Sequence, residues 1–160
     1  MSDGFSHLDE KGRPSMVNVG EKPITKRSAT ARALMYLGAG VIQKLEGDNW
    51  ISPKGAVFQT AVISGVMAAK KTGDLIPLCH PLGLDDCQLH ISIKNEDHIE
   101  ILCTAKVHGK TGIEMEALTG ASLAALTVYD MCKALSQEMV IKEVRLIEKT
   151  GGKKDFKFEE

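Results

Sequence analysis

The sequence predicts an α+β fold, a two-layer sandwich in which helices cover one face of an antiparallel sheet. Segments 88–94 and 99–107 alternate between apolar and polar residues on either side of a turn, and a long apolar helical segment follows them. The full predicted order is strand, helix, helix, hairpin, helix, strand. This is the β-α-β-β-α-β order of a ferredoxin-like arrangement, with one additional helix in the first crossover. Because the 160 residues contain no repeat or long linker, we expect one domain over 1–160.

The first half of the chain predicts an arm, a strand and two helices. Residues 1–22 are polar and hold glycines and prolines, which is typical of an arm outside the core. Residues 25–36 alternate imperfectly and predict a strand, and 38–45 predict a short helix. The turn 52–55, Ser-Pro-Lys-Gly, then precedes a helix over 56–71, where apolar residues recur at helical spacing.

The second half predicts the hairpin, a long helix and a last strand. Between the strands 88–94 and 99–107, Asn-Glu-Asp at 95–97 is a favourable turn. The long helix is expected from about Glu114, and a strand over 140–149 follows it. The tail 150–160 begins with glycines and lysines, so its composition predicts a mobile segment.

Only two charged side chains, Asp130 and Lys133, interrupt the segment 117–137. Its apolar residues are spread around the helix, which is typical of a buried helix, and the i, i+3 spacing places the two charges on one face. One interpretation is a buried structural ion pair; the other is a catalytic acid/base pair whose pKa values are tuned by burial. The helix is also more apolar than one sheet can cover, so we expect a homo-oligomer.

Composition excludes several functional classes. A net charge of −1 and an aromatic content of 4% do not favour a nucleic-acid surface or a base-stacking platform. No stretch reaches the roughly 18 apolar residues of a membrane span, and no signal peptide is evident. The four cysteines form no CxxC pair. We therefore expect a cytoplasmic protein with reduced thiols that binds neither nucleic acid nor membrane.

The segment 77–81, Pro-Leu-Cys-His-Pro, places Cys79 and His80 in a loop that two prolines stiffen. A lone loop histidine is usually a surface residue. A zinc site here would need ligands from elsewhere in the chain, and their spacing matches no common zinc motif. The candidate ligands are Cys103, Cys132 and His108.

Residues 109–116, Gly-Lys-Thr-Gly-Ile-Glu-Met-Glu, stand at the start of the long helix. The glycines and Lys110 suit an anion, although the spacing is not that of a P-loop, and Glu114 and Glu116 oppose an anion there. The two acids either complement the helix dipole or accept hydrogen bonds from a guanine edge.

Basic residues are scattered elsewhere in the sequence. Taken singly, each is most simply interpreted as a solvated surface residue. Together they could neutralise a triphosphate. The residues concerned are Arg27, Lys54, His80 and Lys133, with the basic stretch 149–154.

Three segments, 70–82, 111–119 and 126–134, resemble the signature segments of the cyclic pyranopterin monophosphate synthase family, also called molybdenum cofactor biosynthesis protein C. The resemblance runs from about Met16 to Phe156. It implies a lyase that takes 3′,8-cyclo-7,8-dihydro-GTP, supplied by an upstream radical enzyme, to cyclic pyranopterin monophosphate, with release of pyrophosphate. It also implies a ferredoxin-like homohexamer, a trimer of dimers whose sites are completed across subunits. No resident metal or cofactor is implied, although Mg²⁺ could accompany the triphosphate.

By the same resemblance, Asp130 would be the acid/base, with Lys133 beside it and Lys54 reaching in. The substrate would be bound by eight residues, with His80 and Arg27 facing phosphate. They are Leu78, Cys79, His80, Glu114, Met115, Glu116, Arg27 and Lys149.

Two alternatives remain open at this point. One is a nucleotide-binding protein that keeps the pocket without the reaction, and the other is a zinc-dependent hydrolase built on Cys79 and His80. Departures from the family pattern at Ala56 and Val62 lie outside the residues assigned to chemistry.

Overall fold

The computed structural model describes residues 11–159, so residues 1–10 of the expected arm lie outside it. Its main feature is a five-stranded sheet in the order β4-β5-β1-β6-β7, in which all neighbouring strands are antiparallel. The strands are β1 (Thr25–Tyr36), β4 (Asp86–Ile93), β5 (His98–Gly109), β6 (Val140–Thr150) and β7 (Phe156–Lys157). The predicted strands and hairpin are confirmed within a few residues at each end.

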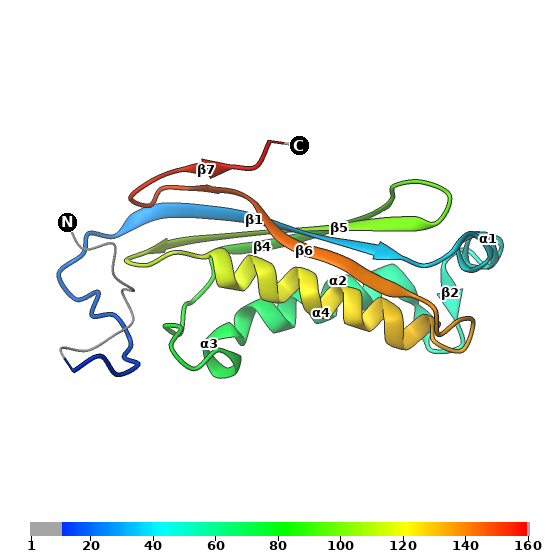
Figure 1. Cartoon of the computed structure of the whole chain (residues 1–160), viewed down its shortest axis with the longest axis horizontal. Coiled ribbons are helices and arrows are strands. Elements are labelled where there is room, and N and C mark those ends of the chain that lie inside the picture. The colour runs from blue at the N-terminus through cyan, green and yellow to red at the C-terminus, as the bar shows by residue number, and fades with distance from the viewer. Residues whose placement is uncertain (1–10, 160) are drawn as a thin grey trace.

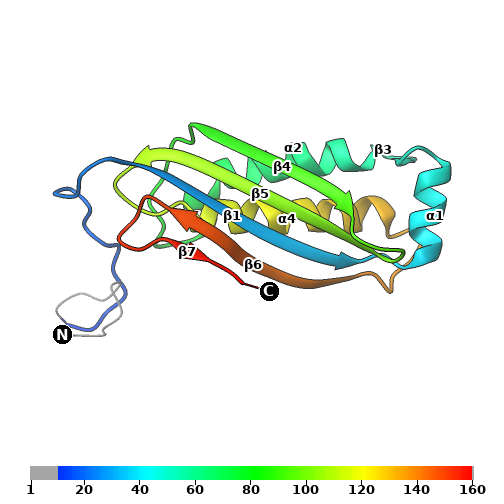
Figure 2. The same ribbon diagram turned by 90° about the horizontal axis from the view of Figure 1, so that it is seen from above.

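Helices α2 (Val57–Lys70) and α4 (Glu114–Cys132) pack side by side on one face of this sheet. Figure 1 shows both helices below the sheet, and Figure 2 shows that their axes run roughly along the strand direction. Three shorter elements complete the fold. They are α1 (Ala39–Gly47), α3 (Thr72–Leu75) and the small hairpin of β2 (Ile51–Ser52) and β3 (Gly55–Ala56).

The core forms where alternate strand residues meet the inner sides of the helices. Ala29, Ala31 and Ala33 of β1 are buried, while the residues between them face away from the helices. Small side chains on the sheet let α4 approach closely, and α4 presents alanines in turn, such as Ala121 and Ala124. This packing holds α4 in place against the sheet. Side chains at the two ends of α4 are therefore held in defined positions.

Two glycines allow α2 and α4 to pack closely. A Cβ atom added to Gly65 would lie 2.8 Å from the carbonyl oxygen of Gly120 and would overlap the Leu89 side chain. Side chains larger than hydrogen therefore do not fit at this crossing.

The outer face of the two helices remains apolar and exposed. Ile63 and Met67 of α2 are 60% and 52% exposed, and Leu126 of α4 is 52% exposed. The prediction that the long helix is buried all round is therefore wrong for a single chain. The helix is also shorter than predicted, since it ends at Cys132 and Lys133 is its C-cap residue.

Four short elements were not predicted from sequence, namely the one-turn helix α3 and the strands β2, β3 and β7. β7 pairs with the end of β6, although composition had predicted a mobile tail from residue 150. The turn between them needs Gly151, which has a φ of 82°, and a Cβ there would overlap the carbonyl oxygen of Lys26. Within residues 11–159, no helix has the length and apolar character required to cross a membrane.

Candidate active site

Lys54, Asp130 and Lys133 form one polar cluster at the C-terminal end of α4. The Lys54 ammonium donates to Asp130 Oδ2 at 2.6 Å and to the Asp130 carbonyl oxygen at 3.1 Å. Lys133 Nζ lies 2.8 Å from Asp130 Oδ1. Each carboxylate oxygen therefore has its own ammonium donor, an arrangement of charge-assisted hydrogen bonds.

The β2–β3 hairpin positions Lys54 against α4. The Lys54 backbone N–H donates to Ser52 Oγ at 3.1 Å, and that hydroxyl donates to the Gly55 carbonyl oxygen at 3.3 Å. Gly55 has a φ of 112°, a backbone conformation that side chains disfavour. The tight turn predicted at 52–55 thus positions Lys54 next to Asp130.

This cluster is exposed, although the sequence predicted burial. The side chains of Lys54, Asp130 and Lys133 are 50%, 53% and 55% accessible. Hydrogen bonds from Lys133 and then Lys54 lower the pKa of Asp130 to about 2, and Asp130 raises the pKa of Lys133 in return. The shift therefore comes from charge pairing and not from burial, and Asp130 is ionised at neutral pH.

A pocket of about 500 Å³ lies at the opposite end of α4. It contains all six residues that the resemblance assigned to substrate binding from the 77–81 loop and the start of α4. These are Leu78, Cys79, His80, Glu114, Met115 and Glu116. Val17, Lys22 and Lys153 also line it, and no motif in the sequence had pointed to Val17 or Lys22. Lys153 lies in the basic stretch that sequence analysis had noted.

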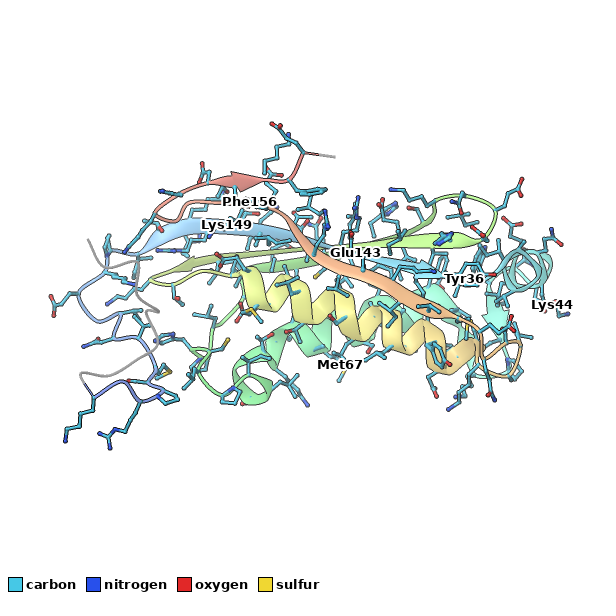
Figure 3. All side chains as sticks on the ribbon, viewed as in Figure 1. Tyr36, Lys44, Met67, Glu143, Lys149 and Phe156 are labelled. Atoms are coloured by element: carbon cyan, nitrogen blue, oxygen red, sulfur yellow. The ribbon has the colours of Figure 1, made fainter. Side chains whose placement is uncertain are left out.

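Arg27 and Lys149 lie beside this pocket, around Glu114. Lys149 Nζ donates to Glu114 Oε1 at 2.8 Å, and Arg27 Nε donates to the Gly109 carbonyl oxygen at 3.1 Å. Figure 3 shows Lys149 at the same end of the molecule as the β6–β7 turn. Burial raises the pKa of Glu114, but the hydrogen bond from Lys149 and the charges of Lys149 and Arg27 outweigh it, so the pKa is lowered.

Glu116 has the opposite environment. It is 3% exposed, and burial, with the negative charge of Glu114 adding to it, raises its pKa from 4.5 to about 6. The pocket therefore holds one firmly ionised carboxylate and one that gains a proton readily. Both can meet the hydrogen-bond donors of a ligand.

We expect Glu116→Gln to stabilise the fold at pH 8 but not at pH 4.5. Because the pKa of Glu116 is raised in the folded protein, its favourable contribution is complete below about pH 4.5 and is lost as pH rises through about 6. Removing the charge should therefore raise the free energy of unfolding at pH 8 by up to about 2 kcal/mol. Urea unfolding at the two pH values measures this, and an equal effect at both would contradict it. Glu114→Gln is the control, expected to destabilise.

The two clusters are far apart within one chain. Glu114 and Asp130 are sixteen residues apart on the same helix, which at 1.5 Å per residue separates them by about 24 Å. Figure 3 shows Lys149 toward one end and Lys44 of α1 at the other, where the chain continues into the β2–β3 hairpin. One chain therefore does not bring Lys54, Asp130 and Lys133 together with the pocket residues.

The structure does not favour zinc ligation by the cysteines. Cys103 and Cys132 are fully buried in the core, away from the pocket that Cys79 and His80 line. Burial and the charge of Glu116 raise the pKa of the Cys79 thiol, whereas zinc binds the thiolate. Across residues 11–159, no three His, Cys, Asp or Glu side chains gather as a metal site would require.

A family model and several known proteins that match this chain all point to the same family. The family model described as "MoaC family" matches residues 16–152. The cyclic pyranopterin monophosphate synthase of Xanthomonas oryzae pv. oryzae (strain MAFF 311018) is 52% identical over 151 residues, which cover 94% of this chain and 92% of that protein. The proteins of the same name from Xanthomonas campestris pv. campestris strains B100 and 8004 are 50% identical with the same coverage.

Proposed function

The chain belongs to the MoaC family, and we propose that it converts 3′,8-cyclo-7,8-dihydro-GTP to cyclic pyranopterin monophosphate and pyrophosphate in molybdenum cofactor biosynthesis. The observation that carries this proposal is the pocket, which places two carboxylates beside several cations. Glu114 and Glu116 suit the N1–H and amino donors of a guanine edge. Arg27 and Lys149 suit the phosphates.

The site is completed by a second copy of the chain. Since about 24 Å separates the two clusters, the Lys54–Asp130–Lys133 cluster of one subunit would face the pocket of its neighbour. The exposed apolar face of α2 and α4 supports such an interface, because apolar patches of this kind mark contact sites. We propose the homohexamer, a trimer of dimers, as the assembly. The strand order β4-β5-β1-β6, antiparallel throughout, supports a ferredoxin-like arrangement of each subunit.

In this assembly the exposed cluster supplies the proton transfers and the charge stabilisation. Formation of the cyclic phosphate requires a substrate hydroxyl to lose its proton and attack the α-phosphorus, while the bond to the departing pyrophosphate breaks. Lys54 and Lys133 would stabilise the charge that develops on the phosphate oxygens. A phosphate that takes a hydrogen bond from either lysine withdraws it from Asp130. The pKa of Asp130 then rises, and the carboxylate becomes a more effective base.

No resident cofactor takes part, and a Mg²⁺ ion on the triphosphate would arrive with the substrate from the upstream radical enzyme. Cys79, Cys87, Cys103 and Cys132 are free thiols, which supports a reducing compartment such as the cytoplasm.

The test is incubation of the purified chain with enzymatically prepared 3′,8-cyclo-7,8-dihydro-GTP. The proposal expects a pyranopterin and one equivalent of pyrophosphate per substrate consumed. Tight binding without either product would instead favour a nucleotide-binding protein without the reaction.

A further inference from the structure

The residues before β1 form part of the pocket wall. Residues 15–22, here called the strap, contribute Val17 and Lys22 to the pocket lining. Val17, Val19 and Lys22 are half-buried, whereas Met16, Asn18 and Gly20 are exposed. The strap therefore lies with one side against the body of the protein, although the sequence had predicted an arm outside it.

Two side chains of the pocket region hold the strap by its backbone. Lys110 Nζ donates to the Gly20 carbonyl oxygen at 2.6 Å, and His80 Nε2 donates to the Val17 carbonyl oxygen at 2.8 Å. Lys110 directly follows β5, so its own position is fixed by the sheet. In both bonds the acceptor is a backbone carbonyl oxygen of the strap, so neither contact depends on a side chain of the strap.

These bonds set the position of Lys22. It is two residues beyond the Gly20 carbonyl, and its backbone N–H donates to the Val19 carbonyl oxygen at 3.1 Å. Pro23 follows and restricts the Lys22 backbone to extended conformations. The ammonium of Lys22 is thus carried on a short, constrained segment between the Lys110 bond and the start of β1.

The bond to Val17 also limits what His80 can donate to a phosphate. The Nε2–H of His80 is used by the Val17 carbonyl oxygen and is not free for a second acceptor. The resemblance had implied that His80 faces phosphate. In this geometry His80 Nε2 holds the strap, and Lys22 is the group on the strap that offers N–H donors to an anion.

We propose that the strap closes the pocket over the anionic part of the substrate, with Lys110 as the positioning residue that holds it and Lys22 as a substrate-binding residue. This inference rests on the proposed function for its ligand. The strap contacts themselves do not depend on it.

Lys110→Met tests the proposal. Losing the bond to Gly20 should raise the KM for 3′,8-cyclo-7,8-dihydro-GTP about tenfold and leave kcat within about twofold. Lys110→Arg should restore much of the KM, and Lys22→Met should raise it at least as much. Lys44→Met, which removes an exposed lysine on α1, is the control and should behave as the parent.

Hydrogen exchange measures the strap directly and needs no turnover. Amides of residues 15–22 should exchange faster in Lys110→Met, with β1 and β5 unchanged. Added inorganic pyrophosphate should slow this exchange in the parent but not in Lys22→Met. Unchanged exchange in Lys110→Met, or an unchanged KM despite faster exchange, would overturn the proposal. If the parent gives no product, the proposed function fails, and the pyrophosphate experiment still decides the role of the strap.

Discussion

Asp130→Asn is expected to lower kcat by about a thousandfold or more while changing the affinity for substrate only slightly. Asparagine keeps the size of the side chain but takes up no proton and carries no charge. General acid–base groups contribute about 10²–10⁴ in rate, and the two ammonium groups would also lose the carboxylate that holds them at 2.6 and 2.8 Å. Pyrophosphate release measures kcat, and calorimetric titration measures binding.

Asp48→Asn is a matched control for this substitution. Asp48 also forms an exposed ion pair, at 3.1 Å with Lys44, but has no part in the proposed site. We expect parent activity from it, since exposed pairs contribute little to stability. If folded Asp130→Asn gave near-parent kcat, the Asp130–Lys133 pair would be structural, the alternative that the sequence left open.

Lys149→Met is expected to weaken substrate binding while sparing kcat at saturation. Lys149 lies 2.8 Å from Glu114 at the edge of the pocket, where its charge is available to a phosphate. A hydrogen bond to a charged group contributes about 1.5–3 kcal/mol, so the Kd should rise by about 10- to 150-fold.

Lys157→Met, an exposed lysine on β7, is the control for this second substitution. It removes the same charge from the same end of the sheet and should bind substrate as the parent does. A folded Lys149→Met with unchanged Kd would remove Lys149 from the site.

The sheet and its main helices could be predicted because their signals are local. Alternation over the β4–β5 hairpin and in β6 follows from one face meeting the core and the other not. β7 and α3 could not be predicted in this way. β7 has two residues and exists through its pairing with Glu148 and Lys149, while α3 is a single turn.

The residues of the candidate site were proposed from the sequence, but their geometry could not be. The apolar residues around α4 suggested that Asp130 is buried, yet its side chain lies at the exposed end of the helix beside the β2–β3 hairpin. Composition shows that a helix has more apolar surface than usual. It does not show which part of that surface the rest of the same chain buries. The strap was missed for a related reason, since Lys110 and Gly20 lie 90 residues apart and Gly20 belongs to no motif that the sequence singled out.

In the proposed assembly, one site takes Asp130 from one subunit and Lys149 from another. The most direct test is to co-express Asp130→Asn with Lys149→Met and assay the purified mixed assembly at low substrate concentration. If subunits mix at random, about a quarter of the sites receive both parent groups, so activity should return to about a quarter of the parent value.

The matched control is co-expression of Asp130→Asn with Lys54→Met. Both residues belong to the same cluster of one subunit, so every mixed site keeps a defect and no activity should return. Recovery in the first mixture and none in the second is the result that a shared site predicts. No recovery in either mixture, from assemblies shown to contain both variants, would contradict a shared site.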